Sequence, residues 1–127
     1  SYTTSDNDTG SSVKANYVVG KLWFVPDNIN IDAVTSIEGA NNATGDVTRF
    51  HLFSYTFTSG STSALSSGTL LAHSTDQTNA GDEQLYKNTW TIDSASVAAD
   101  KVIVATWESD TINADYTLSV VVKYHLT

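Results

Sequence analysis

The last twelve residues of the chain alternate between two kinds of side chain. Apolar or aromatic residues occupy every second position, namely Tyr116, Leu118, Val120, Val122, Tyr124 and Leu126. Smaller or polar residues mostly lie between them, namely Thr117, Ser119, Val121, Lys123, His125 and Thr127. Successive side chains of a strand point to opposite faces. The pattern therefore predicts an antiparallel strand with one core-facing side and one side that faces water or an interface.

The composition of the whole chain also favours strands over helices. Ser, Thr, Val, Tyr, Trp and Phe are abundant, whereas Lys, Glu, Gln and Arg are scarce. β-branched and aromatic side chains fit a pleated, half-buried surface, and no window repeats its apolar residues with the helical period. We therefore predict an all-β fold, an antiparallel β-sandwich or jelly roll of about eight strands.

Turn-forming residues divide the chain into the strands that this fold needs. Strands are expected over 13–25, with a bend or bulge at Gly20, and over 29–37, 47–58, 69–73, 85–92, 94–97, 101–108 and 116–126. In the second of these, Ile29, Ile31, Ala33, Thr35 and Ile37 are expected to share one face. Strand 101–108 is apolar on both faces and should be central, with residues 110–115 joining it to the last strand as a long hairpin loop.

The first twelve residues differ from the rest, because they are polar and contain one aromatic side chain. They predict an extended N-terminal arm, residues 1–12, ahead of a single domain, residues 13–127. The arm is either a passive, disordered tail or a contact arm of the kind that often holds neighbouring subunits in lattices. The small, weakly polar face of the last strand can be buried against a symmetry mate without leaving an unpaired charge. The candidate contact residues are therefore Ser1, Tyr2, Asp6, Asp8, Thr117, Ser119 and Val121.

Charge and cysteine content exclude several classes of function. The 14 acidic and 6 basic side chains give a net charge of −8, which argues against a nucleic-acid partner, because phosphate binding needs clustered Lys and Arg. The absence of cysteine excludes disulfides, thiol catalysis and thiolate metal sites. No apolar run approaches the roughly 20 residues of a transmembrane helix, so no membrane partner is expected.

The residue patterns predict neither a catalytic site nor a cofactor. His51, His73 and His125 occur without the G-x-S-x-G motif of a serine nucleophile, and most acidic residues are aspartates in turns, where they cap the backbone. Residues 27–32 space oxygen ligands somewhat like the start of a calcium loop but lack its later glycine and glutamate. Their alternation with isoleucine favours a strand, and calcium binding is left open.

The three tryptophans have two interpretations. Trp23, Trp90 and Trp107 could form a sugar-stacking platform, as in a secreted carbohydrate-binding module, or could fill the core or a subunit interface. Aromatic side chains in a sandwich usually do the latter. The core or interface is therefore the favoured interpretation, and a carbohydrate-binding module would require exposed, coplanar tryptophans.

The second half of the chain resembles the small jelly-roll domains of tailed-phage structural proteins. The resemblance rests on Thr91-Ile92-Asp93, the short strand Ser94–Val97, the run from Ala98 to Val104 and the terminal strand Tyr116–Leu126. It extends loosely over residues 13–127. Ala99 replaces the usual glycine before the aspartate of the central strand, which puts a tight turn there in doubt, and Thr111–Asp115 replaces a glycine-rich stretch.

The resemblance implies a non-enzymatic role on the outside of a virion. Members of this family often form homotrimers and serve as capsid cement (decoration) proteins or as tip domains of head or tail fibres. We therefore expect a homotrimer that binds the major capsid protein on the capsid exterior, with no catalytic residue and no cofactor. The alternatives are a receptor-binding fibre tip and the carbohydrate-binding module.

Overall fold

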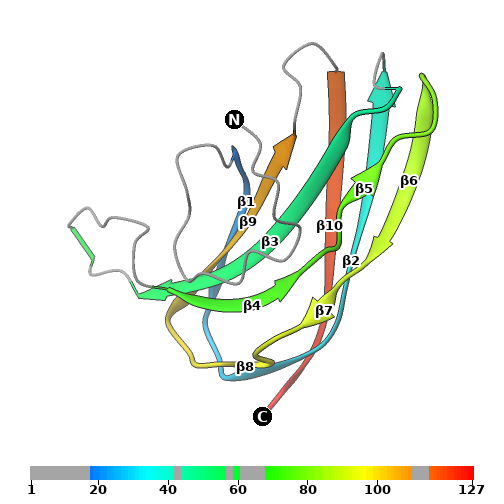
Figure 1. The fold of residues 1–127 in the computed structure, drawn as a ribbon. Helices are drawn as coiled ribbons and strands as arrows, with labels where there is room; N and C mark the ends of the chain where they lie inside the picture. Colours follow the sequence, from blue (N-terminus) through cyan, green and yellow to red (C-terminus); the bar gives the residue numbers. More distant parts are fainter. Residues whose placement is uncertain (1–17, 42–43, 57–58, 61–67, 110–114) are drawn as a thin grey trace.

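The computed structural model describes residues 18–41, 44–56, 59–60, 68–109 and 115–127 (Figure 1). Within these ranges, every regular secondary-structure element is a β-strand. They are β1 (Val18–Val25), β2 (Ile29–Asn41), β3 (Val47–Thr56), β4 (Thr69–His73), β5 (Gln77–Thr78), β6 (Gln84–Thr89), β7 (Thr91–Ile92), β8 (Ser96–Val97), β9 (Lys101–Ser109) and β10 (Asp115–Leu126). The expected arm, residues 1–12, and most of the loop at 59–68 lie outside the described residues.

The strands form two antiparallel sheets that pack face to face. The larger sheet has the order β1-β9-β3-β4-β7, with β5 also paired to β3, and the smaller sheet has the order β10-β2-β6, with β8 also paired to β2. The chain changes sheet at most connections, which is typical of jelly-roll and Greek-key sandwiches (Figure 1). The predicted sandwich is confirmed, and the described ranges contain ten strands, of which three are only two residues long.

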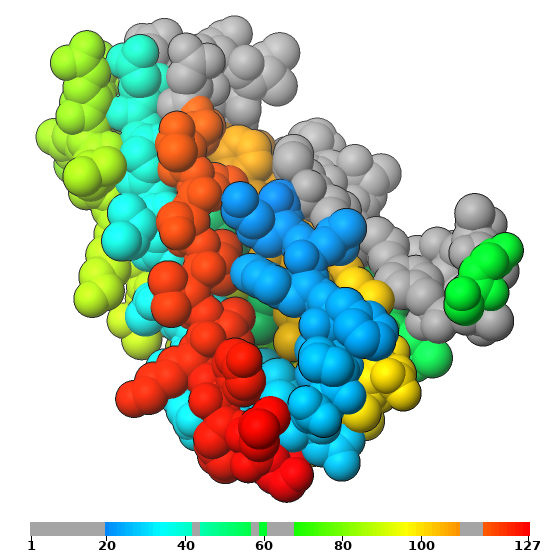
Figure 2. Space-filling model, turned by 180° about the vertical axis from the view of Figure 1, so that it is seen from behind, coloured from blue at the N-terminus to red at the C-terminus, as the bar shows by residue number. Residues whose placement is uncertain are grey.

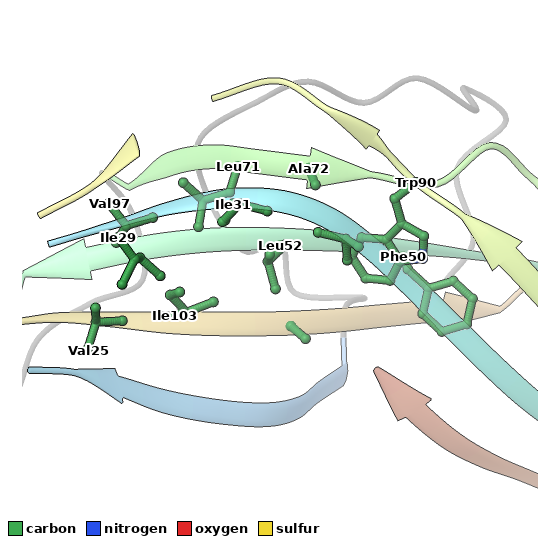
Figure 3. Packing of buried hydrophobic residues seen from close by; sticks show 12 residues of the cluster. Val25, Ile29, Ile31, Phe50, Leu52, Leu71, Ala72, Trp90, Val97 and Ile103 are labelled. Atoms are coloured by element: carbon green, nitrogen blue, oxygen red, sulfur yellow. The ribbon is translucent and has the colours of Figure 1, made fainter. Parts of the chain in front are cut away.

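Large side chains from both sheets fill the space between them. Figure 3 shows Val25, Ile29 and Val97 at one end of this core and the rings of Phe50 and Trp90 at the other. The Phe50 and Trp90 rings stack with centroids 5.6 Å apart, and Trp90 Nε1 donates a hydrogen bond of 2.9 Å to Ser36 Oγ. The indole therefore stabilises the contact between the sheets through both its apolar surface and its one polar atom.

β9 is central, as predicted, but it does not form a hairpin with β10. It pairs with β1 on one side and β3 on the other, which leaves neither edge of β9 for a further strand. β10 pairs with β2 in the smaller sheet instead. The hairpin prediction was wrong because sequence proximity suggested a partner whose two edges were already occupied by strands far away in the chain.

A β-bulge at Asp32 reverses the expected faces of β2. In the ladder between β2 and β10, Ala33 lies opposite Lys123 and Ile31 lies opposite Tyr124, so Asp32 is the extra residue. One extra residue moves every later side chain to the other face. Ile29 and Ile31 point into the core as expected, but Val34, Ser36, Glu38 and Ala40 then follow them inward, and Ile37 is 47% exposed.

Other local expectations are confirmed or corrected. Gly20 lies at an irregularity in the ladder between β1 and β9, which confirms the predicted bulge. The strand expected over 85–92 is instead divided at Trp90, where the chain leaves the smaller sheet (β6) for the larger one (β7). The turn before β9 is present despite Ala99, because Asp100 adopts the left-handed conformation (φ 68°), which aspartate tolerates better than most residues.

Candidate interaction surface

An apolar groove of about 400 Å³ opens between β1 and β10, the edge strands of the two sheets. Its lining residues are Trp23, Phe24, Val25, Pro26, Asp27, Ile29, Ile103, Val120, Val121, Val122, Tyr124 and Leu126. Among these, Asp27 carries the only charge. We call this feature the β1–β10 groove. Its volume and apolar lining match those of sites that bind drug-sized molecules or large side chains.

The largest exposed apolar side chains gather around this groove. The described part of the chain has seven such residues, and five of them belong to β1 and β10: Leu22, Phe24, Val121, Tyr124 and Leu126. Tyr124 and Leu126 lie opposite the buried Ile31 and Ile29, so they point inward as predicted, yet they are 55% and 65% exposed. Figure 2 shows β10 beside β1, with β2 and β6 on the other side of β10. Clustering of this kind is typical of surfaces that bind other proteins, membranes or ligands.

The predicted contact face of the last strand adjoins the groove. Thr117, Ser119 and Val121 are exposed on the outer face of the smaller sheet, opposite Gly39, Ile37 and Thr35 of β2. None of these six residues is charged, so this surface can be covered without burying an ion. The four candidate contacts in the arm, Ser1, Tyr2, Asp6 and Asp8, lie outside the described residues.

Two of the three histidines are neighbours, and the third lies on the other sheet. His51 is buried on β3, directly across the ladder from His73 on β4. His73 Nδ1 lies 2.7 Å from Asp93 Oδ2, and His125 Nδ1 lies 2.9 Å from Oδ1 of the bulged Asp32. Among the residues that the structure describes, no group of three His, Asp or Glu side chains could hold a metal ion. The oxygen-rich segment 27–32 spans three different surroundings. Asp27 lines the groove, Ile29 and Ile31 are buried in the core, and Asp32 is the extra residue of the bulge.

A buried ionic network was not anticipated from the sequence. The guanidinium of Arg49 is fully buried, and its Nε and Nη2 donate bonds of 2.8 and 3.1 Å to the two carboxylate oxygens of Asp76. Nε also lies 3.3 Å from Oε1 of the buried Glu108, which faces Arg49 across the β3–β9 ladder. The one signal in the sequence was an arginine and a glutamate within strands rich in apolar side chains. Since none of the three residues lines the groove, we assign them a structural role.

Glu38 is a second buried carboxyl, placed in the interior by the bulge in β2. Its Oε2 accepts a 2.7 Å hydrogen bond from Thr48 Oγ1. Burial raises the pKa of Glu38 above 4.5, and the hydrogen bond from Thr48 opposes this shift only in part. The folded state therefore holds this proton more tightly than the unfolded state does, and the contribution of Glu38 to stability falls as pH rises above 4.5.

Glu38→Gln is therefore expected to raise the melting temperature relative to the parent chain at neutral pH. Gln cannot ionise, so the difference between the two proteins should be smallest near pH 4.5 and should grow with pH. Thermal melts across this range measure it. Glu83→Gln, which removes the same charge from an exposed position, is the matched control. A difference that shrinks as pH rises would contradict the assigned direction.

The tryptophans do not form a common exposed platform. Trp90 is 5% exposed, and Trp23 and Trp107 are partly buried against the core. The interpretation as core residues is thus confirmed for Trp90, while Trp23 also lines the groove.

The described residues contain no helix with the length and hydropathy needed to cross a membrane. Comparisons with known proteins identify no family for this chain. Searches against protein-family models, curated proteins and solved structures give no match for this chain.

Proposed function

We propose that this protein is a non-enzymatic virion structural protein, a capsid decoration (cement) protein that binds the outside of a phage head as a homotrimer. The observation that carries the proposal is the concentration of exposed apolar side chains around the β1–β10 groove, on an otherwise acidic chain. A surface of this kind is suited to protein contacts. The uncharged outer face of β10, with Thr117, Ser119 and Val121, extends that surface.

Two further features support a structural role over a catalytic one. The acidic side chains Asp76, Glu108 and Glu38 are engaged by Arg49 and Thr48 inside the fold. The buried Trp90 removes one of the three aromatic rings that a sugar-stacking platform would need. In the proposed mechanism each copy makes a modest contact with the major capsid protein, and trimerisation converts these contacts into tight binding through a high effective concentration.

The proposed function is tested by light scattering of the free protein and by a density map of the intact particle. We expect three times the mass of one chain in solution. On the particle, the sandwich should lie on the outer surface of the head, at junctions between major capsid subunits. Density at the tip of a head or tail fibre would replace this role with receptor binding, and a monomer in solution would remove the trimer.

A further inference from the structure

A second apolar patch lies at the edge of the smaller sheet opposite β10. Leu85 of β6 is 78% exposed, and Ile37 of β2 is 47% exposed on the same face. Lys87, also exposed, follows Leu85 on that face and lies across the ladder from Ile37. We call these three residues the Leu85 patch. Because the sheet order is β10-β2-β6, Leu85 and Lys87 lie on the edge strand that β2 separates from β10 (Figure 2), whereas Ile37 lies on β2 itself, opposite Ser119 of β10.

The groove and the patch each combine exposed apolar side chains with one charge, and the two charges have opposite signs. The groove is apolar with one carboxylate, that of Asp27, whereas the patch presents the exposed Leu85 side chain on the same face as the ammonium group of Lys87. Together they account for Phe24, Val121, Tyr124 and Leu126 at the groove and for Ile37 and Leu85 at the patch, which is six of the seven large exposed apolar residues described. A pair between Asp27 and Lys87 would offset part of the repulsion between copies that each carry −8.

We propose that the β1–β10 groove of one copy receives the Leu85 patch of a second copy, with the Leu85 side chain in the groove and Lys87 beside Asp27. Since the two surfaces are different parts of the same molecule, the contact is head-to-tail, and such a contact builds a ring when its rotation closes. This inference rests on the proposed function, because it names the contact that closes the trimer.

Two substitutions and their mixture test the proposal. Leu126→Lys places a charge in the groove and leaves the patch intact, whereas Leu85→Lys does the reverse. Each variant alone is expected to be a monomer by light scattering at micromolar concentration. An equimolar mixture should form a dimer, because one intact groove and one intact patch remain between the two variants. Both side chains are exposed, so thermal melts should show that each variant stays folded.

The matched control is Ser96→Lys, which adds the same charge at an exposed position on β8 and should leave the trimer intact. A symmetric contact between two copies of β10 predicts a different pattern, in which Leu85→Lys associates like the parent chain and the mixture gains no dimer. That pattern would overturn the proposal. A trimer that survives both leucine substitutions would overturn the proposed contact and leave the proposed trimer in place. A parent chain that is a monomer would overturn both the contact and the trimer.

Charge reversal tests the contact between Asp27 and Lys87. Asp27→Lys or Lys87→Asp alone should weaken association by at least about twofold, as expected for a charge pair at the rim of an interface. The double variant should regain affinity, because it restores opposite charges in exchanged positions. Equal affinities of the two single variants and the parent chain, or a double variant weaker than both single variants, would place these residues outside the contact.

Discussion

Arg49→Ala is expected to lower the free energy of unfolding by about 3–5 kcal/mol, a large part of the total for a domain of this size. Arg49 is fully buried, and Glu108 beside it is fully buried as well. Removing the guanidinium leaves the carboxylates of Glu108 and Asp76 without the cation that balances them. Urea denaturation followed by tryptophan fluorescence measures the loss.

Arg49→Lys separates the charge from the geometry of the network. Lysine keeps the positive charge but cannot donate the two parallel bonds that Arg49 makes to Asp76, so an intermediate loss is expected. Lys101→Ala is the surface control, since its exposed bond to Thr56 should contribute no more than about 0.5 kcal/mol. A loss below about 1 kcal/mol for Arg49→Ala would contradict the structural role assigned to the network.

Trp90→Ala is expected to cost a similar amount, about 3–5 kcal/mol, through the cavity that it leaves. The indole is 5% exposed and stacks on Phe50, so the site cannot collapse without moving both sheets. The substitution also removes the hydrogen-bond donor to Ser36 Oγ, a hydroxyl on a residue that is only 1% exposed. Denaturation with urea, as for Arg49, provides the measurement.

Trp90→Phe divides that loss into its two sources. Phenylalanine restores most of the ring but not the indole N–H, so the remaining loss, about 1–3 kcal/mol, reports the buried Ser36 hydroxyl and the smaller volume. Trp23→Phe, at a partly buried position on the rim of the core, should cost less than Trp90→Phe. The reverse order would show that the buried Trp90 contributes less to the stability of the core than the partly buried Trp23.

One extra residue in β2 decides that the carboxyl of Glu38 is buried and that the apolar side chain of Ile37 is exposed. Both follow from the single extra residue at Asp32, which turns Glu38 inward and Ile37 outward. Nothing in the sequence of β2 marks this position, because Ile29, Ile31, Ala33, Thr35 and Ile37 form an uninterrupted alternating pattern. The register with β10, in which Asp32 also contacts His125, is set by partners about 90 residues away.

The local properties of this chain were readable from its sequence, since they depend on neighbouring residues. The β composition, the inward side chains of β10, the bulge at Gly20 and the central, two-sided apolar strand β9 all follow from the period of two and from turn residues. The position of the weakly polar face with Thr117, Ser119 and Val121 follows from the same alternation.

Only the tertiary structure decided which strands are neighbours, and therefore where the surfaces lie. It paired β10 with β2 instead of β9, brought Arg49 to Asp76 and Glu108, and left the edges of β1 and β10 apart to form the groove. Strand pairing depends on long-range contacts that must each outweigh a loss of chain entropy, and many pairings satisfy the same alternation. The periodicity of a strand fixes its two faces, but the identity of its neighbours determines what those faces touch.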